Sequence, residues 1–395
     1  MRFIKTHILY QVNESPAKKN ILVVTGETSG DHHGALVVRA LKEIDRSVHV
    51  YGIGGEELSS AGMDIIYHSR NLSVVGILEV FSRAFHILKA FSSIRKEFRR
   101  SPPALVLLID YPDFNLRIAK IAKKHNVPVL YYISPQIWAW RRGRAKKISR
   151  IVDRMAVIFP FEAPLYEKVG LDVHFVGHPL LDQEVKLLAR PQALKAFDLE
   201  EGRPIIGLLP GSRKGEIDRM FPPMLEAAEL ISRQVPSARF VLALAPGINA
   251  GSVENLVMQK KVPVKVVSNS FYQVLDICDL ALVVSGTATL ETALMGSPMV
   301  IIYKVSPLTY LIGRLLIRVD CIGLANIVAG KKVVPELIQG EVTPQKIAEE
   351  ALNILNDPQR METMKTELSF IKKSLGEKGA SQRVARMAYE MIHNA

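Results

Sequence analysis

Short apolar runs alternate with amphipathic stretches through the first half of the chain. The strand-like runs occupy residues 21–25, 48–53, 105–109, 129–133 and 155–159. Between them the apolar positions recur every three or four residues, as over 34–43 and 115–125, which is typical of helices with one buried face. Strands that alternate with helices form βαβ units, so the pattern predicts a parallel sheet covered by helices.

A second α/β half follows a polar region that contains a Gly-His-Pro turn. An amphipathic stretch lies over 222–234, and the strand-like runs of this half occupy residues 205–209, 240–245, 264–267, 280–284 and 298–303. The length of 395 residues also favours two domains, because one compact core rarely grows so large. We expect the boundary within 178–203, where glycine and proline punctuate the chain.

The chain is strongly basic, with a formal net charge of +12. Such a charge suggests an anionic partner, which is a nucleic acid, a phosphorylated substrate or the anionic face of a membrane. The longest apolar stretch, residues 307–325, is interrupted by three charged residues, so we do not expect a membrane-spanning helix. The two cysteines lack a CxxC spacing, which favours reduced thiols in a cytoplasmic protein.

Acidic and hydroxyl residues follow the first strand-like run. Glu27, Ser29 and Asp31 lie in a glycine-bounded segment at the carboxyl end of that run, where open parallel sheets place their ligand sites. The adjacent His32 and His33 point in different directions on a helix, so we expect no metal site there.

Two carboxylates follow the apolar run over 105–109. Asp110 directly ends that run, and a partly buried carboxylate at this point can accept a proton from a substrate hydroxyl. Asp113 either caps the following helix or lines the same site.

Cationic and hydroxyl loops follow two strand-like runs of the second half. The backbone amides of Gly211 and Ser212, together with Arg213, suit a diphosphate. The segment of Ser285, Gly286 and Thr287 offers amides at a helix start, which also favour phosphate, and Glu291 lies where a carboxylate can accept ribose hydroxyls.

Two further stretches have more than one interpretation. Both tryptophans of the chain precede a basic run over 141–150, which fits nucleic acid, a lipid interface, a sugar-phosphate pocket or a solvated helix. The amphipathic stretch over 74–91 continues into Arg95, Lys96, Arg99 and Arg100. It is either a helix that faces the core or an element that lies on an anionic bilayer.

These residues together resemble the lipid-A-disaccharide synthase family of inverting glycosyltransferases, which have the GT-B architecture. The resemblance runs through almost the whole chain from residue 21, and its motifs are GETSGD (26–31), IDYPDFN (109–115), SPQIWAWR (134–141), LPGSR (209–213) and SGTATLE (285–291). It implies an α/β fold of two Rossmann-like domains that face each other across a cleft. The implied division is an extension over 1–20, an acceptor-binding domain over 21–185, a UDP-sugar-binding domain over 186–360 and C-terminal helices over 361–395, whose packing back on the N-terminal domain is left open.

The resemblance also implies a reaction. The donor is UDP-2,3-diacylglucosamine, the acceptor is 2,3-diacylglucosamine 1-phosphate, and a β-1,6 linkage forms with release of UDP. Family members need no metal and no other cofactor. The implied setting is lipid A biosynthesis by a peripheral protein on the cytoplasmic face of the bacterial inner membrane, with the anionic membrane surface as a partner and no nucleic acid.

Within that reaction we expect Asp110 to take the proton of the acceptor 6-hydroxyl, with Asp113 as the alternative base. Glu27 and Ser29 are expected to orient the acceptor or the base, with Asp31 in the same loop. Asn326 matches a family position implicated in activity, whereas its own sequence context indicates only a turn.

Two rival functions stay open at this point. One is another UDP-sugar enzyme of the same architecture, such as an epimerase or a polyprenol-linked N-acetylglucosaminyltransferase, and the UDP-sugar that is consumed discriminates it. The other is a lipid- or nucleic-acid-binding protein without catalytic activity. That alternative leaves the carboxylate-ended strand and the pair of cationic loops unexplained.

Overall fold

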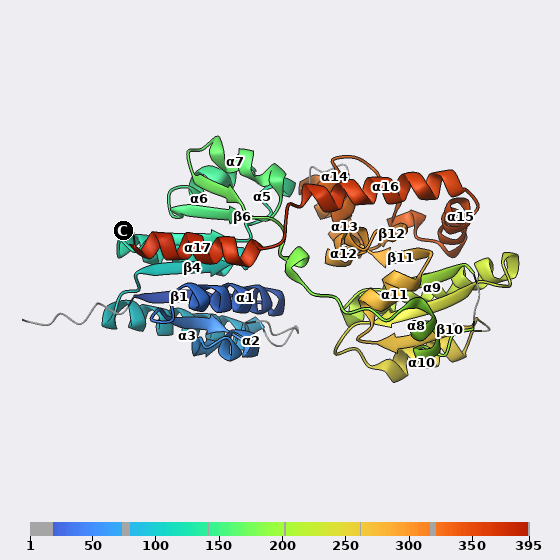
Figure 1. Ribbon diagram of the computed structural model, residues 1–395, viewed down its shortest axis with the longest axis horizontal. Helices are drawn as coiled ribbons and strands as arrows, with labels where there is room; N and C mark the ends of the chain where they lie inside the picture. The colour runs from blue at the N-terminus through green and yellow to red at the C-terminus, as the bar shows by residue number, and fades with distance from the viewer. Residues whose placement is uncertain are drawn as a thin grey trace, which may run out of the picture.

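Two parallel β-sheets, each covered by helices, form two lobes in the computed structural model (Figure 1). The structure describes residues 19–72, 80–140, 142–200, 203–260, 262–316 and 321–393. Most of the predicted extension over 1–20 therefore lies outside the described residues, and the first strand begins at Asn20.

The first sheet has the strand order β3-β2-β1-β4-β5-β6-β7, and every pair is parallel. Its strands are β1 (Asn20–Val24), β2 (His49–Gly54), β3 (Asp64–His68), β4 (Leu105–Ile109), β5 (Val129–Tyr132), β6 (Arg154–Val157) and β7 (Asp172–Phe175). Its helices are α1 (Thr28–Ile44), α2 (Glu56–Ser60), α3 (Val80–Arg100), α4 (Pro112–Lys124), α5 (Ile137–Trp140), α6 (Ala145–Ile148) and α7 (Ala163–Glu167). The strand order reverses between β1 and β4, which makes that point the topological switch of the sheet.

The second sheet has the strand order β10-β9-β8-β11-β12-β13 and is also parallel. Its strands are β8 (Ile205–Leu209), β9 (Arg239–Leu244), β10 (Val264–Ser268), β11 (Leu280–Val284), β12 (Met299–Tyr303) and β13 (Glu336–Ile338). Its helices are α8 (Arg190–Ala196), α9 (Lys214–Gln234), α10 (Ala250–Met258), α11 (Phe271–Ile277), α12 (Thr287–Leu294), α13 (Pro307–Leu316), α14 (Leu324–Ala329), α15 (Pro344–Leu355) and α16 (Pro358–Ser374). The switch point of this sheet lies between β8 and β11.

The central strands of both sheets are the apolar runs of the sequence. Every residue of β4, β8 and β11 is buried, because helices cover both faces of each sheet. The two α/β halves predicted from the sequence are thus confirmed as the fold. The strands that sequence analysis missed are β3, β7 and β13, which all lie at sheet edges and carry exposed or half-exposed positions.

Helix α9 differs from its prediction. It begins at Lys214, eight residues before the predicted start, and it contains Pro222 and Pro223 in its interior. Proline costs a helix one backbone hydrogen bond and normally ends it. Here the buried side chains of Phe221 and Met224 flank the prolines and pack the helix into the core, so tertiary packing overrides the local signal.

The chain crosses between the lobes twice, and the two crossings lie side by side. His178 N donates to Leu375 O at 3.0 Å, and Arg383 Nε donates to Val176 O at 2.9 Å. The carboxylate of Asp182 accepts hydrogen bonds from backbone N–H groups at the start of α17 (Ala380–His393). Helix α16 packs on α12 and α14, whereas α17 packs on α1 of the first lobe (Figure 1).

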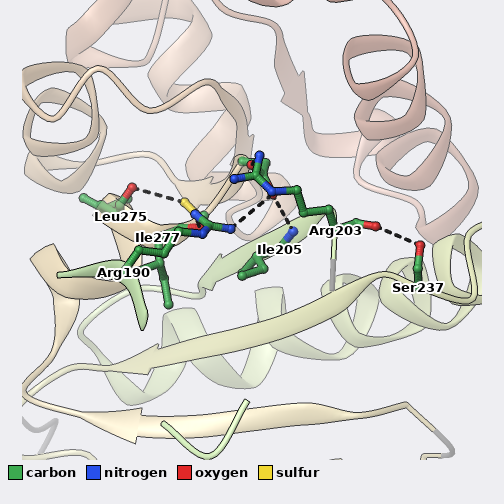
Figure 2. A network of polar contacts seen from close by, with 8 residues as sticks. Arg190, Arg203, Ile205, Ser237, Leu275 and Ile277 are labelled. Atoms are coloured by element: carbon green, nitrogen blue, oxygen red, sulfur yellow. Dashed lines mark hydrogen bonds and ion pairs between the residues drawn. The ribbon is translucent and has the colours of Figure 1, made fainter. Parts of the chain in front are cut away.

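A polar network ties the amino ends of β8 and β11 together at the edge opposite the strand ends that carry the predicted site (Figure 2). Asp279 accepts hydrogen bonds from Ile205 N at 2.8 Å and from Arg203 Nη1 at 3.2 Å. Arg190 of α8 donates to Ile277 O at 2.6 Å. This network therefore secures the segment that enters the second sheet and takes no part in the predicted site.

Helix α3 has one apolar face that is buried and one that is exposed, so it has features of both interpretations that the sequence left open. Ala90, Ile94 and Phe98 are buried, whereas Phe85 and Leu88 are 64% and 68% exposed. Residues 74–79 of the predicted amphipathic stretch lie outside the described residues. Among the described residues, no helix has the length and apolar character needed to cross a membrane.

Candidate functional site

The carboxyl ends of β1 and β4 are adjacent, since Val24 pairs with Leu108 in register. Glu27 follows β1 as the exposed N-cap residue of α1, and Asp110 follows β4 directly. The two acidic segments predicted from the sequence therefore meet at the switch point of the first sheet, and the negative charge of Glu27 acts on Asp110.

The backbone at Asp110 adopts an unusual conformation. Asp110 and Tyr111 have φ angles of 48° and 47°, a left-handed conformation that costs a residue other than glycine about 1–3 kcal/mol. The buried Asn115 offsets this cost, because its Nδ2 donates to Asp110 O at 2.7 Å and to Ile109 O at 3.1 Å. Tyr131 Oη also donates to Asp110 O, at 2.7 Å. Strain held in place by surrounding hydrogen bonds is typical of functional sites.

The environment of the Asp110 carboxyl group raises its affinity for a proton. Burial, and next the charge of Glu27, raise the pKa of Asp110 to about 6. Such a group is ionised at neutral pH and is a far better base than an ordinary carboxylate. Asp113 differs, because its side chain is 88% exposed and lies 3.6 Å from the guanidinium of Arg144. The geometry therefore favours Asp110 over Asp113 as the base.

The rest of the first loop divides into two environments. Thr28 and Ser29 are exposed in the first turn of α1, which begins earlier than the sequence indicated. Asp31 is buried, and its carboxylate accepts hydrogen bonds from Gly55 N at 2.5 Å and Glu57 N at 3.0 Å. Those bonds satisfy the first amides of α2, so Asp31 has a structural task and its predicted contact with substrate stays a prediction.

The donors of the cationic loop after β8 bind the carboxylate of Glu216, at the start of α9. Arg213 Nη1 donates to Glu216 Oε1 at 2.7 Å, and the amides of Ser212 and Arg213 donate to Glu216 Oε2. Gly211 has a φ of 106° and lies against this carboxylate, where a Cβ atom would stand 2.6 Å from Oε2. The Arg213 side chain is 81% exposed. In this state Glu216 engages the donors that the sequence assigned to a diphosphate.

The loop after β11 lies next to that cationic loop, because Val283 pairs with Leu209 in register. Ser285 Oγ donates to Ile322 O at 3.2 Å, and Gly286 is the N-cap residue of α12, which begins at Thr287. The helix start therefore presents its amide groups beside the cationic loop, as a phosphate site requires.

Glu291 lies one turn further along α12. Burial raises the pKa of its carboxyl group, and Tyr272 Oη donates to its Oε1 at 2.6 Å. The same hydroxyl lies 2.7 Å from Gln183 Oε1 in the segment between the lobes. Glu291 is thus connected to that segment through Tyr272, and its predicted contact with ribose stays a prediction.

Asn326 is completely buried in α14. Its Oδ1 accepts hydrogen bonds from Val333 N and Val334 N, and its Nδ2 donates to Glu336 Oε1 at 2.9 Å. Glu336 in turn accepts from Ile322 N, whose carbonyl accepts from Ser285. The arrangement gives Asn326 a positioning role behind the loop after β11, and its part in catalysis stays a prediction.

Four residues with marked environments were given no role from the sequence, namely Glu162, Glu216, Tyr272 and Glu336. Glu162, Tyr272 and Glu336 contact partners that are distant in the sequence. One signal was available for Glu162, because its segment follows the carboxyl end of β6 at the same sheet edge as Asp110. Among the described residues, no group of three or more His, Cys, Asp and Glu side chains is placed to hold a metal ion.

Comparison with known proteins agrees with these motifs. A family model described as lipid-A-disaccharide synthetase matches residues 21–389. The lipid-A-disaccharide synthase of Geobacter sulfurreducens is 48% identical over 372 residues, which cover 94% of this chain and 97% of that protein.

Similarity to solved structures supports the fold of this chain and nothing beyond the fold. A putative UDP-N-acetylglucosamine 2-epimerase from Listeria monocytogenes superposes with a TM-score of 0.64 at 13% identity, covering 96% of this chain and 98% of that one. The glycosyltransferase of kitacinnamycin has a TM-score of 0.63 at 15% identity, covering 95% of this chain and 100% of that one. These likenesses confirm the GT-B fold, whereas the sequence matches carry the assignment: the chain belongs to the lipid-A-disaccharide synthase family.

Proposed function

We propose that this glycosyltransferase transfers 2,3-diacylglucosamine from UDP to the 6-hydroxyl of 2,3-diacylglucosamine 1-phosphate, with UDP as the second product. The observation that carries the proposal is Asp110, a strained and partly buried carboxylate with a pKa raised to about 6, at the switch point of the first sheet. The acceptor binds to the lobe of residues 21–185 and the donor to the lobe of 186–360.

In the proposed reaction Asp110 takes the proton of the 6-hydroxyl while the oxygen attacks the anomeric carbon from the face opposite UDP. This single displacement inverts the anomeric centre. A positioned general base contributes about 10²- to 10⁴-fold to such a step. Glu27, exposed beside Asp110, is suited to orient the acceptor sugar or the base.

The leaving UDP acquires negative charge that the second lobe must stabilise. Arg213, the amides of Gly211 and Ser212, and the helix start at Gly286 and Thr287 supply positive charge and hydrogen-bond donors for it. Their placement at the switch point of the second sheet supports this role. Since these groups meet the charge without a metal, we expect turnover to persist in excess EDTA.

A direct assay tests the proposal. Purified protein is incubated with the two diacylated sugars, and mass spectrometry follows UDP and the disaccharide phosphate, which are expected in equal amounts. UDP-N-acetylglucosamine without acceptor serves as the control substrate. Its conversion to an epimer, with no disaccharide formed from the diacylated pair, would contradict the proposal and favour an epimerase.

We also infer that α3 contacts the membrane that holds both substrates. Its exposed face carries Phe85 and Leu88, followed by basic residues toward its C-terminus: Lys89, Arg95, Lys96, Arg99 and Arg100. In a βαβ unit the helix starts at the carboxyl edge of the sheet, so the apolar part of this face lies at the same edge as Asp110. Acyl chains favour the bilayer by about 0.8 kcal/mol per CH₂, so the enzyme gains by binding the surface.

Vesicle flotation tests this contact. We expect binding to vesicles of anionic lipid at low salt and its loss at high salt. Charge reversal of Arg95, Lys96, Arg99 and Arg100 is expected to abolish binding, whereas reversal of the exposed Lys331 and Lys332 in the second lobe is the matched control. Binding that neither salt nor the α3 reversal reduces would contradict the inference.

A further inference from the structure

One hydroxyl group of the second lobe joins α12 to the segment that crosses between the lobes. Tyr272, the second residue of α11, donates to Glu291 Oε1 at 2.6 Å, and its Oη lies 2.7 Å from Gln183 Oε1. These partners are 19 and 89 residues away along the chain. The proposed reaction gives this tyrosine no task, although it contacts a carboxylate of the helix whose start is assigned to the diphosphate.

The Glu291 carboxyl group has fewer partners than a desolvated charge requires. Burial raises its pKa, and Tyr272 is the one group among the described residues that donates a hydrogen bond to it. A carboxylate can accept about four hydrogen bonds, so a partly buried one with a single donor lacks partners. The two ribose hydroxyls of a nucleotide are donors that would complete the set.

The first crossing segment, residues 183–189, lies along α11. Leu188 N donates to Gln273 Oε1 at 2.6 Å, and Gln273 Nε2 donates to Leu188 O at 3.2 Å. Arg190, which follows the segment, donates to Ile277 O at the other end of α11 (Figure 2). Helix α11 therefore holds the segment by its side chains at one end and by its backbone at the other.

Gln183 is the first residue of this segment that the second lobe holds. Its neighbour Asp182 is bound instead to backbone N–H groups at the start of α17, which packs on α1 of the first lobe. The chain therefore passes from the first lobe to the second between Asp182 and Gln183. Tyr272 thus contacts both the helix of the nucleotide side and the junction of the lobes.

The Tyr272 hydroxyl has one proton for two acceptor oxygens. Burial, and next the charge of Glu291, raise the pKa of Tyr272, so the hydroxyl keeps this proton at neutral pH. The charged carboxylate attracts the proton more strongly than the amide oxygen of Gln183 does. Ribose hydroxyls that donate to the carboxylate compete with the tyrosine, and its proton then strengthens the bond to Gln183.

We propose that Tyr272 is a positioning residue, which turns the Glu291 carboxylate toward the two ribose hydroxyls of a uridine nucleotide and links that carboxylate to Gln183 at the lobe junction. That Glu291 receives the ribose rests on the proposed function, in which the second lobe binds UDP. A nucleotide with both hydroxyls therefore steadies the crossing segment, and a nucleotide without them does not.

A pair of nucleotides tests the positioning role. We expect the wild type to bind UDP roughly 10- to 100-fold tighter than 2′,3′-dideoxyuridine diphosphate (dideoxy-UDP), which lacks both hydroxyls. Glu291→Gln removes the charged acceptor and Tyr272→Phe removes its orientation, so each should lower this affinity ratio several-fold. Tyr389→Phe, in α17, is the matched control and should keep the wild-type ratio. Titration calorimetry measures the affinities, and circular dichroism verifies the fold of each variant.

The affinity ratio separates positioning from packing. If Tyr272 only packs α11, Tyr272→Phe leaves the ratio at the wild-type value, and that result would overturn the proposal. Gln273→Met frees the backbone of Leu188 but keeps the contact between Tyr272 and Glu291, so it should retain the ratio. A loss in Gln273→Met as large as that in Tyr272→Phe would show that any loosening of α11 has this effect, and it would also overturn the proposal.

Hydrogen exchange tests the link to the lobe junction. We expect UDP to slow the exchange of backbone amides over 184–189 several-fold in the wild type, and dideoxy-UDP at equal occupancy to leave it unchanged. Gln183→Met keeps the side-chain length but removes the amide oxygen, so this variant should bind UDP without slower exchange. It tests the link even if Tyr272→Phe does not fold. Slower exchange that persists in Gln183→Met would refute the link.

Failure of this inference is distinguishable from failure of the proposed function. Sugar transfer by the wild type, together with an affinity ratio that Tyr272→Phe leaves unchanged, would refute the role of Tyr272 and keep the proposed function. A ratio that falls in Tyr272→Phe, in a protein that transfers no sugar between the diacylated substrates, would refute the proposed reaction and keep the role of Tyr272 at a nucleotide site.

Discussion

The two sheets share the strand order around their switch points but carry opposite chemistry there. The first places Glu27 and Asp110 between β1 and β4, and the second places Arg213 and the start of α12 between β8 and β11. The fold therefore fixes where a site lies, and a few side chains at the strand ends decide what each site binds. One switch point is acidic and the other is cationic.

The two switch points also differ in how firmly they are held. Asp110 lies in a left-handed backbone fixed by Asn115, in a setting buried enough to raise its pKa. Arg213 is largely exposed, and its guanidinium pairs with Glu216. A base gains reactivity from desolvation, whereas a diphosphate site must stay open to a large charged ligand. Rigidity on the acidic side and access on the cationic side are what the two proposed tasks would require.

The largest expected effect comes from the acidic side. Asp110→Asn should lower kcat by about 10²- to 10⁴-fold, because the amide cannot accept the proton. Since the pKa of Asp110 is raised on folding, ionisation costs stability between pH 4 and 6, and the variant should unfold at no lower temperature than the wild type. Steady-state kinetics and calorimetry check both statements. Asp113→Asn is the matched control. A large loss of kcat in that variant alone would identify Asp113 as the general base.

The cationic side should show a smaller effect of a different kind. Arg213→Ala removes a charge-assisted bond to the diphosphate and should weaken UDP binding roughly 10- to 100-fold. Arg233→Ala, at an exposed arginine near the other end of α9 that is paired with Glu229, should bind UDP like the wild type. Titration calorimetry measures both. Equal UDP affinity in the two variants would remove Arg213 from the site.

The sequence predicted which strand ends carry polar side chains, but not the strand order that makes them switch points or the contacts within each. Buried parallel strands are continuous apolar runs, and the polar residues that end them are visible in the sequence. The edge strands β3 and β7 were missed because exposed positions interrupt their apolar pattern. The contact of Glu162 with Ser134 spans 28 residues and depends on two neighbouring strand ends, so no local pattern announces it. The pKa of Asp110 likewise arises from burial, which only the folded chain supplies.

Buried asparagines support both switch points, and the one behind the cationic side offers a test of stability. Asn326→Ala takes this partner from the amides of Val333 and Val334 and from the carbonyl of Val334, and it removes one of the two donors to Glu336 Oε1. We expect a cost of about 2–4 kcal/mol of unfolding free energy. Urea unfolding measures this loss. Asn356→Ala, at a C-cap in α15 without such contacts among the described residues, is the control and should change stability by about 0.5 kcal/mol or less. A stable Asn326→Ala protein with little activity would instead indicate direct contact with substrate.

The smallest expected effect separates the two causes of the Asp110 pKa. Because the base acts in its ionised form and its pKa is about 6, kcat/KM should fall about tenfold per pH unit below pH 6. Glu27→Gln removes the neighbouring charge but not the burial, which is the larger cause. The acid limb of the pH profile of this variant should therefore move to lower pH. The pKa read from it should still lie above the ordinary aspartate value near 4. A pH profile of the two proteins decides the matter: an acid limb that does not move would mean that burial alone tunes Asp110 and that the acidic loop serves the acceptor sugar only.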